Sequence, residues 1–306
     1  MDDPDTTGNN EIGAPYLCMS FVPGKPVSEV WFGPSGTLSQ EELRLRILAS
    51  LSRVMAQFSR LTFNKMGSIM EDGSGSTVIG PLYDWDEKED GRLQVAASGP
   101  FDSTSAFLQQ NEVASSNENV WDKAEAKVVA AILGCLPTLD SPPGFVLCPH
   151  DFDSQNVLVD DEVTVTGLID WDLAQTMPRI VGYARYPGWI TRDWDPLMYG
   201  WPKTAESEDS PVTLERYRAY YNTDLGKALK WQGDWNSTDK SHMAEAIWIA
   251  ALRRHNRLEI CRKFVQVAAG DDIKALDIVY DIGAGQYDEE NWGILQTNLR
   301  RLIRSC

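Results

Sequence analysis

Apolar side chains recur at helical spacing along much of the chain. In the clearest case, Ser39 and Glu42 form a capping box, and apolar residues follow at intervals of three and four as far as Leu61. This spacing predicts a core helix from Ser39 to Leu61. The same argument predicts further helices over 121–136, 212–230, 240–268, 271–282 and 289–304. The C-terminal part of the chain is therefore predicted to be largely helical.

Short apolar and β-branched runs in the middle of the chain predict strands. They cover 145–148, 157–159 and 163–169, and the last two flank an acidic turn at 160–162. The expected order is a strand, a polar loop and a hairpin. By contrast, the glycines and prolines from residue 64 to about 120 predict an irregular insertion that carries short strands.

The insertion contains the glycine-rich run Gly73-Ser74-Gly75-Ser76. Its spacing differs from both glycine-rich motifs that bind phosphate, and acidic residues precede it. We therefore predict a hairpin or loop turn at this position.

Polar groups suited to metal and proton chemistry accompany the predicted hairpin. Asp151 precedes Asn156 by five positions, and Asp170 follows at the end of the next strand, so all three are expected to converge at the mouth of the hairpin. Phosphoryl transfer uses one carboxylate to accept a hydroxyl proton, and an amide with a second carboxylate to hold Mg²⁺.

Two other interpretations of the same residues remain open. Asp151, Asp153, Gln155 and Glu162 fall at ligand positions of a calcium loop, although Asn156 occupies the position where such a loop needs glycine. A solvated acidic turn without a ligand is the other alternative.

The stretch FVLCPHDFDSQNVLVDDEVTVTGLIDWD, from Phe145 to Asp172, resembles the catalytic loop and metal-binding segment of the aminoglycoside phosphotransferase and choline kinase family. Members usually carry H-x-D-x-x-x-x-N followed by an apolar-I-D-W-D/E ending, whereas here Pro149 takes the usual histidine position. The resemblance implies a protein-kinase-like fold, Asp151 as catalytic base, Asn156 and Asp170 as Mg²⁺ ligands, and ATP as co-substrate.

The segment from Pro15 to Gly24 is similar to the hinge between the two lobes of that family. The similarity implies that Tyr16, Cys18 and Met19 contact the adenine ring, while the residues alone also fit a plain core strand. Since few residues precede Pro15, we expect the N-terminal β-lobe to be largely absent.

The expected fold class is thus α+β, a mainly helical kinase-like C-terminal lobe with a small catalytic β-hairpin. The expected organisation is a disordered acidic tail over 1–11, a hinge-like strand remnant over 12–24, and the helical lobe over 25–306 with its insertion at about 64–120.

A loop rich in tryptophan and proline follows the metal-binding segment. Its W-x-x-x-D-W-D-P pattern is similar to fungal-type members of the family. Candidate residues for an acceptor pocket are Asp172, Trp189, Asp193, Trp194 and Asp195. The alternative is that the tryptophans simply pack this loop onto the lobe.

Charge and composition narrow the possible partners. A net charge of -17 and a pI near 4.6 argue against nucleic-acid binding and are compatible with a cationic small molecule. Neither a membrane span nor a secretory pattern is evident, which predicts a soluble cytoplasmic protein with no membrane partner. The 5 cysteines include no C-x-x-C pair and argue against a disulfide framework. The sequence leaves the oligomeric state open.

Two functions follow from these observations. The first is an ATP- and Mg²⁺-dependent phosphotransferase that acts on a small-molecule hydroxyl. The second is a kinase-fold protein without phosphotransfer activity, serving as a binding or regulatory protein or as a repurposed acid-base enzyme.

Overall fold

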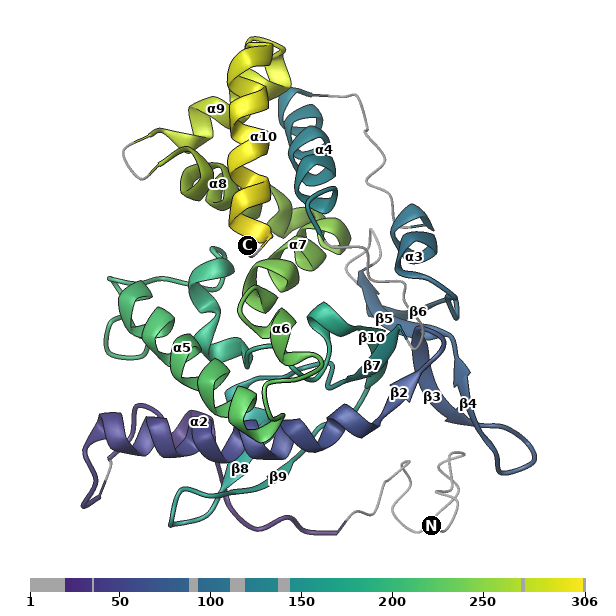
Figure 1. The fold of residues 1–306 in the computed structure, drawn as a ribbon, viewed down its shortest axis with the longest axis vertical. Helices are drawn as coiled ribbons and strands as arrows, with labels where there is room; N and C mark the ends of the chain where they lie inside the picture. Colours follow the sequence, from purple (N-terminus) through teal and green to yellow (C-terminus); the bar gives the residue numbers. More distant parts are fainter. Residues whose placement is uncertain are drawn as a thin grey trace.

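The computed structural model describes residues 20–34, 36–87, 93–110, 119–136, 144–270 and 273–304. The predicted tail and most of the predicted hinge, including Tyr16, Cys18 and Met19, lie outside the described residues. Figure 1 shows helices together with short antiparallel strands, so the α+β class is confirmed.

The helices are α1 (Val27–Val30), α2 (Gln40–Ala56), α3 (Thr104–Gln110), α4 (Val120–Leu133), α5 (Pro211–Ala228), α6 (Trp235–Thr238), α7 (Ser241–Leu252), α8 (Arg254–Ala269), α9 (Ala275–Ala284) and α10 (Glu289–Ile303). The strands are β1 (Lys25–Pro26), β2 (Thr62–Phe63), β3 (Gly67–Glu71), β4 (Thr77–Gly80), β5 (Leu82–Glu87), β6 (Leu93–Ser98), β7 (Phe145–Cys148), β8 (Val157–Val159), β9 (Val165–Leu168) and β10 (Gln175–Pro178).

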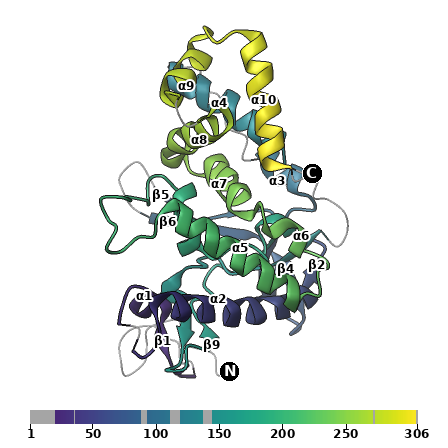
Figure 2. The same cartoon turned by 60° about the vertical axis from the view of Figure 1, so that its left-hand side comes forward.

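The helices form two packed groups. At one end of the molecule α4, α8, α9 and α10 gather around a common apolar core, which α7 also joins. Near the other end, α2 lies beside α5, and a second core fills the space between them and the β8–β9 hairpin (Figure 2). The capping box predicted for α2 is present in part, because the hydroxyl of Ser39 accepts a hydrogen bond from the backbone N–H of Glu42 at 3.1 Å.

The strands that position the candidate site belong to two sheets. Strand β7 lies inside a five-stranded sheet of order β2-β7-β10-β3-β4, and all four of its residues are buried. A three-stranded sheet of order β1-β8-β9 holds the predicted hairpin, with Val157 opposite Leu168. The loop between β7 and β8 therefore joins two sheets and is fixed at both ends.

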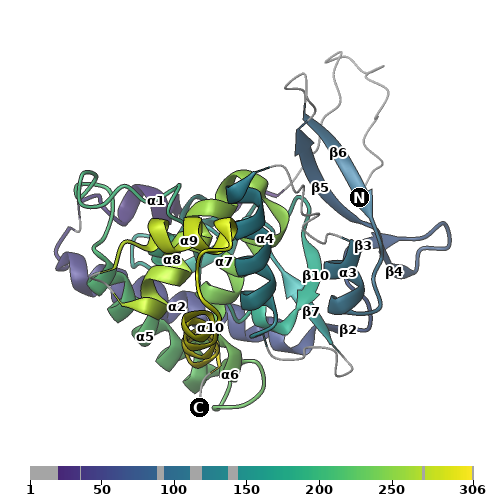
Figure 3. The same cartoon turned by 90° about the horizontal axis from the view of Figure 1, so that it is seen from above.

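The segment expected as an irregular insertion is more regular than predicted. It forms two hairpins: β3 and β4 extend the sheet of β7, while β5 and β6 pair with each other and reach away from the helices (Figure 3). The glycine-rich run lies in the turn between β3 and β4, where a carboxylate oxygen of Asp72 accepts hydrogen bonds from the N–H groups of Ser74 and Ser76. This confirms the predicted hairpin turn.

The prediction of a single helix over 240–268 is wrong. Arg253 adopts an extended conformation, with φ -111° and ψ 103°, and divides the segment into α7 and α8. The guanidinium of Arg257 donates hydrogen bonds to the carbonyl oxygens of Ala250 and Ala251, which are left without helical partners at the end of α7. Among the described residues, no helix has the length and apolar character needed to cross a membrane.

Candidate functional site

Asp151 lies on the loop between β7 and β8, and two amide side chains orient its carboxylate. Oδ2 of Asp151 accepts hydrogen bonds from Nε2 of Gln155 at 2.7 Å and from Nδ2 of Asn156 at 3.0 Å. The same Nδ2 atom also donates to the backbone oxygen of Asp151 at 3.0 Å. Asp151 is exposed, whereas Asn156 is only 8% exposed. The buried amide thus holds an accessible carboxylate in place.

Asp170 follows the second strand of the hairpin and is tied to the same loop. The backbone N–H of Ile169 donates to the carbonyl oxygen of Asn156 at 2.9 Å, which places the next residue, Asp170, beside Asn156 in the backbone framework. Asp170 is exposed and has a φ of 56°, in the left-handed region that few non-glycine residues adopt. Conformations of this kind collect at functional sites, where the surrounding structure enforces them.

The oxygen atoms available at this end of the hairpin are of the kind that binds Mg²⁺. With Nδ2 of Asn156 committed to Asp151, the amide oxygen is the atom left to bind a cation, and Asp170 supplies a carboxylate. Mg²⁺ prefers oxygen ligands, and its sites commonly combine one or two carboxylates with water and substrate phosphates. Within the part of the chain that the structure describes, no cluster of three or more His, Cys, Asp or Glu residues could hold a metal by itself.

The calcium-loop interpretation does not fit the geometry. Asp153 is buried and forms an ion pair with Arg192, and its carboxylate also accepts from the backbone N–H of Ser154 at 2.7 Å. Strand β8 lies within the candidate calcium loop, and the elements on either side of that loop are strands β7 and β9, where an EF-hand requires helices. Asp153 therefore anchors the loop to the tryptophan-rich segment that follows.

A second anchor of the loop was not predicted from the sequence. Nη2 of Arg185 donates to the carbonyl oxygens of Pro149, at 3.0 Å, and of His150, at 3.3 Å, the two residues directly before Asp151. Its Nη1 atom donates to Oε1 of Glu245 on α7 at 2.5 Å. Burial raises the pKa of Glu245, and the positive charge of Arg185 opposes that rise. The guanidinium therefore holds the segment where Pro149 replaces the usual histidine.

Two cavities adjoin this loop, and Arg185 and Glu245 line both. The loop pocket, of about 160 Å³, is lined by Asp151 together with Trp194 and Asp195. The aromatic pocket, of about 450 Å³, lies beside it, and His150 lines both cavities as well. The structure thus brings two of the candidate acceptor residues, Trp194 and Asp195, next to Asp151.

The other candidate acceptor residues lie elsewhere. Asp193 is buried, and its two carboxylate oxygens accept from Arg218 at 2.6 and 3.1 Å, so its side chain supports the fold of this loop. Trp189 is buried against Trp31 and Phe152. Asp172 is exposed on the turn after β9.

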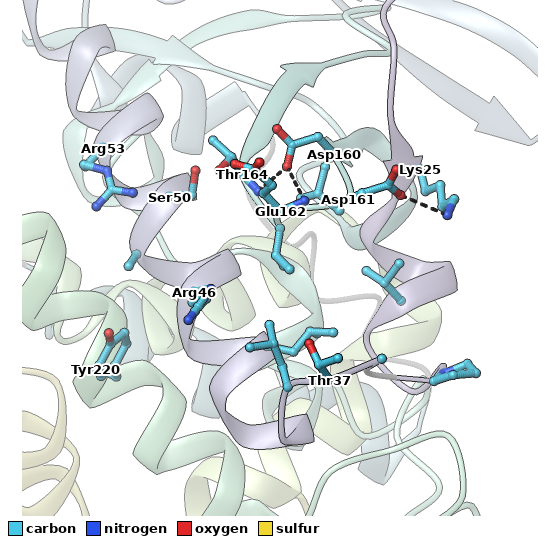
Figure 4. Close-up of a pocket in the computed structure, with 18 residues that line it drawn as sticks. Lys25, Thr37, Arg46, Ser50, Arg53, Asp160, Asp161, Glu162, Thr164 and Tyr220 are labelled. Carbon is cyan, nitrogen blue, oxygen red and sulfur yellow. Dashed lines mark hydrogen bonds and ion pairs between the residues drawn. The ribbon is translucent and has the colours of Figure 1, made fainter.

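A larger cavity, the hairpin groove of about 780 Å³, is separate from these residues (Figure 4). It lies between α2 and the tip of the β8–β9 hairpin. One of its acidic groups is used within the turn, since a carboxylate oxygen of Asp160 accepts from the N–H groups of Glu162 and Thr164. Asp161 forms an exposed ion pair with Lys25. The lining of the groove includes neither Asp151 nor Asn156 nor Asp170.

Comparison with known proteins assigns the chain to a family. The sequence model of the phosphotransferase enzyme family (APH) matches residues 5–220. This range includes the loop that carries Asp151 and the end of the hairpin that carries Asp170. The chain belongs to this family. No curated protein and no solved structure matches the chain significantly.

Proposed function

We propose that the protein transfers the γ-phosphoryl group of ATP to a hydroxyl group of a small molecule. The observation that supports this proposal is the hydrogen bonding of the loop to the hairpin. The amide of Asn156 donates to the carboxylate of Asp151, and the carbonyl oxygen of Asn156 accepts from the N–H of Ile169, the residue before Asp170. Family membership supports the reaction class, and the loop pocket beside Asp151 offers space for an acceptor.

Each group has a distinct part in the proposed reaction. The carboxylate of Asp151 accepts the acceptor's proton as the hydroxyl oxygen bonds to the γ-phosphorus and the bond from that phosphorus to the β-phosphate oxygen breaks, which releases ADP. Asn156 and Asp170 would hold Mg²⁺, which neutralises charge on the phosphates when it is bound. Tyr16, Cys18 and Met19 remain the proposed adenine contacts.

Substitution of the proposed base tests this assignment. ADP formation from Mg·ATP is measured with a panel of small hydroxyl compounds, some carrying amines and some neutral. Asp151→Asn keeps the size of the side chain and removes the proton acceptor, so the rate is expected to fall by about 10²- to 10⁴-fold without a loss of thermal stability.

The matched control is Asp161→Asn, which removes a carboxylate from the exposed tip of the same hairpin. It should turn over ATP at the native rate. Native turnover in Asp151→Asn would exclude Asp151 as the base.

A further inference from the structure

The aromatic pocket beside the catalytic loop has an apolar wall that phosphoryl transfer itself does not require. Its lining includes the large apolar side chains Met66, Leu82, Phe107, Met177, Trp248 and Leu252. The rings of Phe107 and Trp248 stack with 4.9 Å between centroids and an interplanar angle of 6°. A volume of about 450 Å³ falls within the range of small-molecule sites and exceeds what a single side chain needs.

Several polar groups of this pocket lie where it adjoins the loop pocket. His150, Arg185 and Glu245 line both cavities. Nε2 of Gln175 lies 3.4 Å from Nδ1 of His150 and donates to the carbonyl oxygen of Tyr83 at 3.1 Å. A molecule in the aromatic pocket thus meets hydrogen-bonding groups at the end that leads towards Asp151.

The charges in the lining argue against a cationic occupant. Of the described residues that line the aromatic pocket, Glu245 alone carries a carboxylate, and Arg185 pairs with it at 2.5 Å. Arg253 adds a second guanidinium to the lining. Among the described lining residues, an ammonium group would meet only a carboxylate that is already paired with Arg185, and it would lose its hydration, which is unfavourable.

We propose that the aromatic pocket binds the body of the acceptor, and that the acceptor is an uncharged aromatic or similarly apolar alcohol. Its hydroxyl group extends past His150 into the loop pocket, towards the carboxylate of Asp151. This assignment of substrate class rests on the proposed function. It differs from the cationic acceptor that the overall charge of the chain is compatible with.

A pair of matched probes tests the proposal without ATP. 2-Naphthylmethanol and 2-naphthylmethylamine have the same size, and at pH 7 only the amine is charged. Calorimetric titration should show saturable binding of the alcohol that is at least tenfold tighter than binding of the amine. Equal or tighter binding of the amine, or no binding of the alcohol, would overturn the assignment.

Strand β6 supplies variants that locate the bound probe. Ala96 and Ser98 line the aromatic pocket, whereas Ala97, between them on the strand, points to the other face. Ser98→Trp and, independently, Ala96→Trp should each weaken binding of 2-naphthylmethanol at least tenfold. Ala97→Trp, the control on the same strand, should bind like the native protein.

If Ser98→Trp and Ala96→Trp both fold and both bind 2-naphthylmethanol with native affinity, the probe binds elsewhere and the proposal is overturned. Because these titrations contain no nucleotide, they also separate the two claims. Tight binding of the alcohol together with absent ATP turnover would contradict the phosphotransferase function and leave the pocket assignment standing.

Discussion

The contact between Arg185 and the loop from β7 to β8 leads to a quantitative prediction for Arg185→Met. This change removes a guanidinium that is 10% exposed from its partner Glu245, which is 21% exposed. Breaking a buried ion pair by removing one partner costs about 3–5 kcal/mol, and the residual exposure of Glu245 favours the lower end, about 3 kcal/mol. The carbonyl oxygens of Pro149 and His150 lose their donor at the same time.

Two measurements check this prediction. Urea denaturation at pH 7 should show a free energy of unfolding that is lower by about 3 kcal/mol. Hydrogen-deuterium exchange should show that the peptide covering residues 149–156 exchanges at least tenfold faster, because the loop has lost its main-chain anchor.

The pH dependence of this defect has a definite sign. Burial already raises the pKa of Glu245, and without Arg185 that pKa rises further. Between its ordinary pKa and its folded pKa, the carboxyl group binds protons more tightly in the folded state, so stability falls as the pH rises through this window. The defect of Arg185→Met should therefore be smaller at pH 5 than at pH 7.

Arg179→Met provides the control. Arg179 pairs with both carboxylate oxygens of Asp234, at 2.7 and 2.9 Å, away from the loop between β7 and β8. Its loss should lower global stability and leave exchange over 149–156 at the native level once global unfolding is accounted for. The reasoning fails if Arg185→Met loses less than about 1 kcal/mol, or if the two variants affect the loop equally.

Two further predictions concern stability. Burial, together with nearby cations, lowers the pKa of His242 well below its usual value, so the unfolded state binds a proton first and stability falls as the pH drops below about 6.5. His242→Leu should remove about 1.4 kcal/mol per pH unit of this loss in stability. Identical pH slopes of the unfolding free energy in native and variant urea titrations would contradict this prediction. A Cβ atom at Gly283 on α9 would overlap a backbone carbonyl oxygen of α4, whereas one at Gly293 on α10 meets open space. In urea denaturation, Gly283→Ala should therefore lower the free energy of unfolding by about 1–3 kcal/mol and Gly293→Ala should raise it by about 0.5–1 kcal/mol. A stabilising effect of Gly283→Ala would refute the close helix contact.

Local sequence patterns predicted the elements whose physical causes are local. Ser39 caps α2, and the apolar spacing after it gives the buried face of that helix. The break at Arg253 could not be predicted in this way, since neither glycine nor proline marks it. The backbone is extended at Arg253, and Arg257 caps the carbonyl groups that the break exposes.

The same distinction applies to the candidate site. The spacing of Asp151, Asn156 and Asp170 carries a family pattern along one short segment, so the sequence was sufficient to select them. Arg185 and Glu245 have no comparable pattern, because they come from distant segments and meet only in the folded chain. The ion pair of Asp193 with Arg218 likewise depends on packing that the sequence does not display.

The central claim, a phosphotransferase site built on the β8–β9 hairpin, is tested most directly by calorimetric titration with ATP in excess Mg²⁺. We predict binding that disappears when Mg²⁺ is omitted, disappears in Asp170→Ala, and is retained in the hairpin-tip control Asp161→Ala. Absence of ATP binding in excess Mg²⁺, or undiminished Mg²⁺-dependent binding in Asp170→Ala, would contradict the claim.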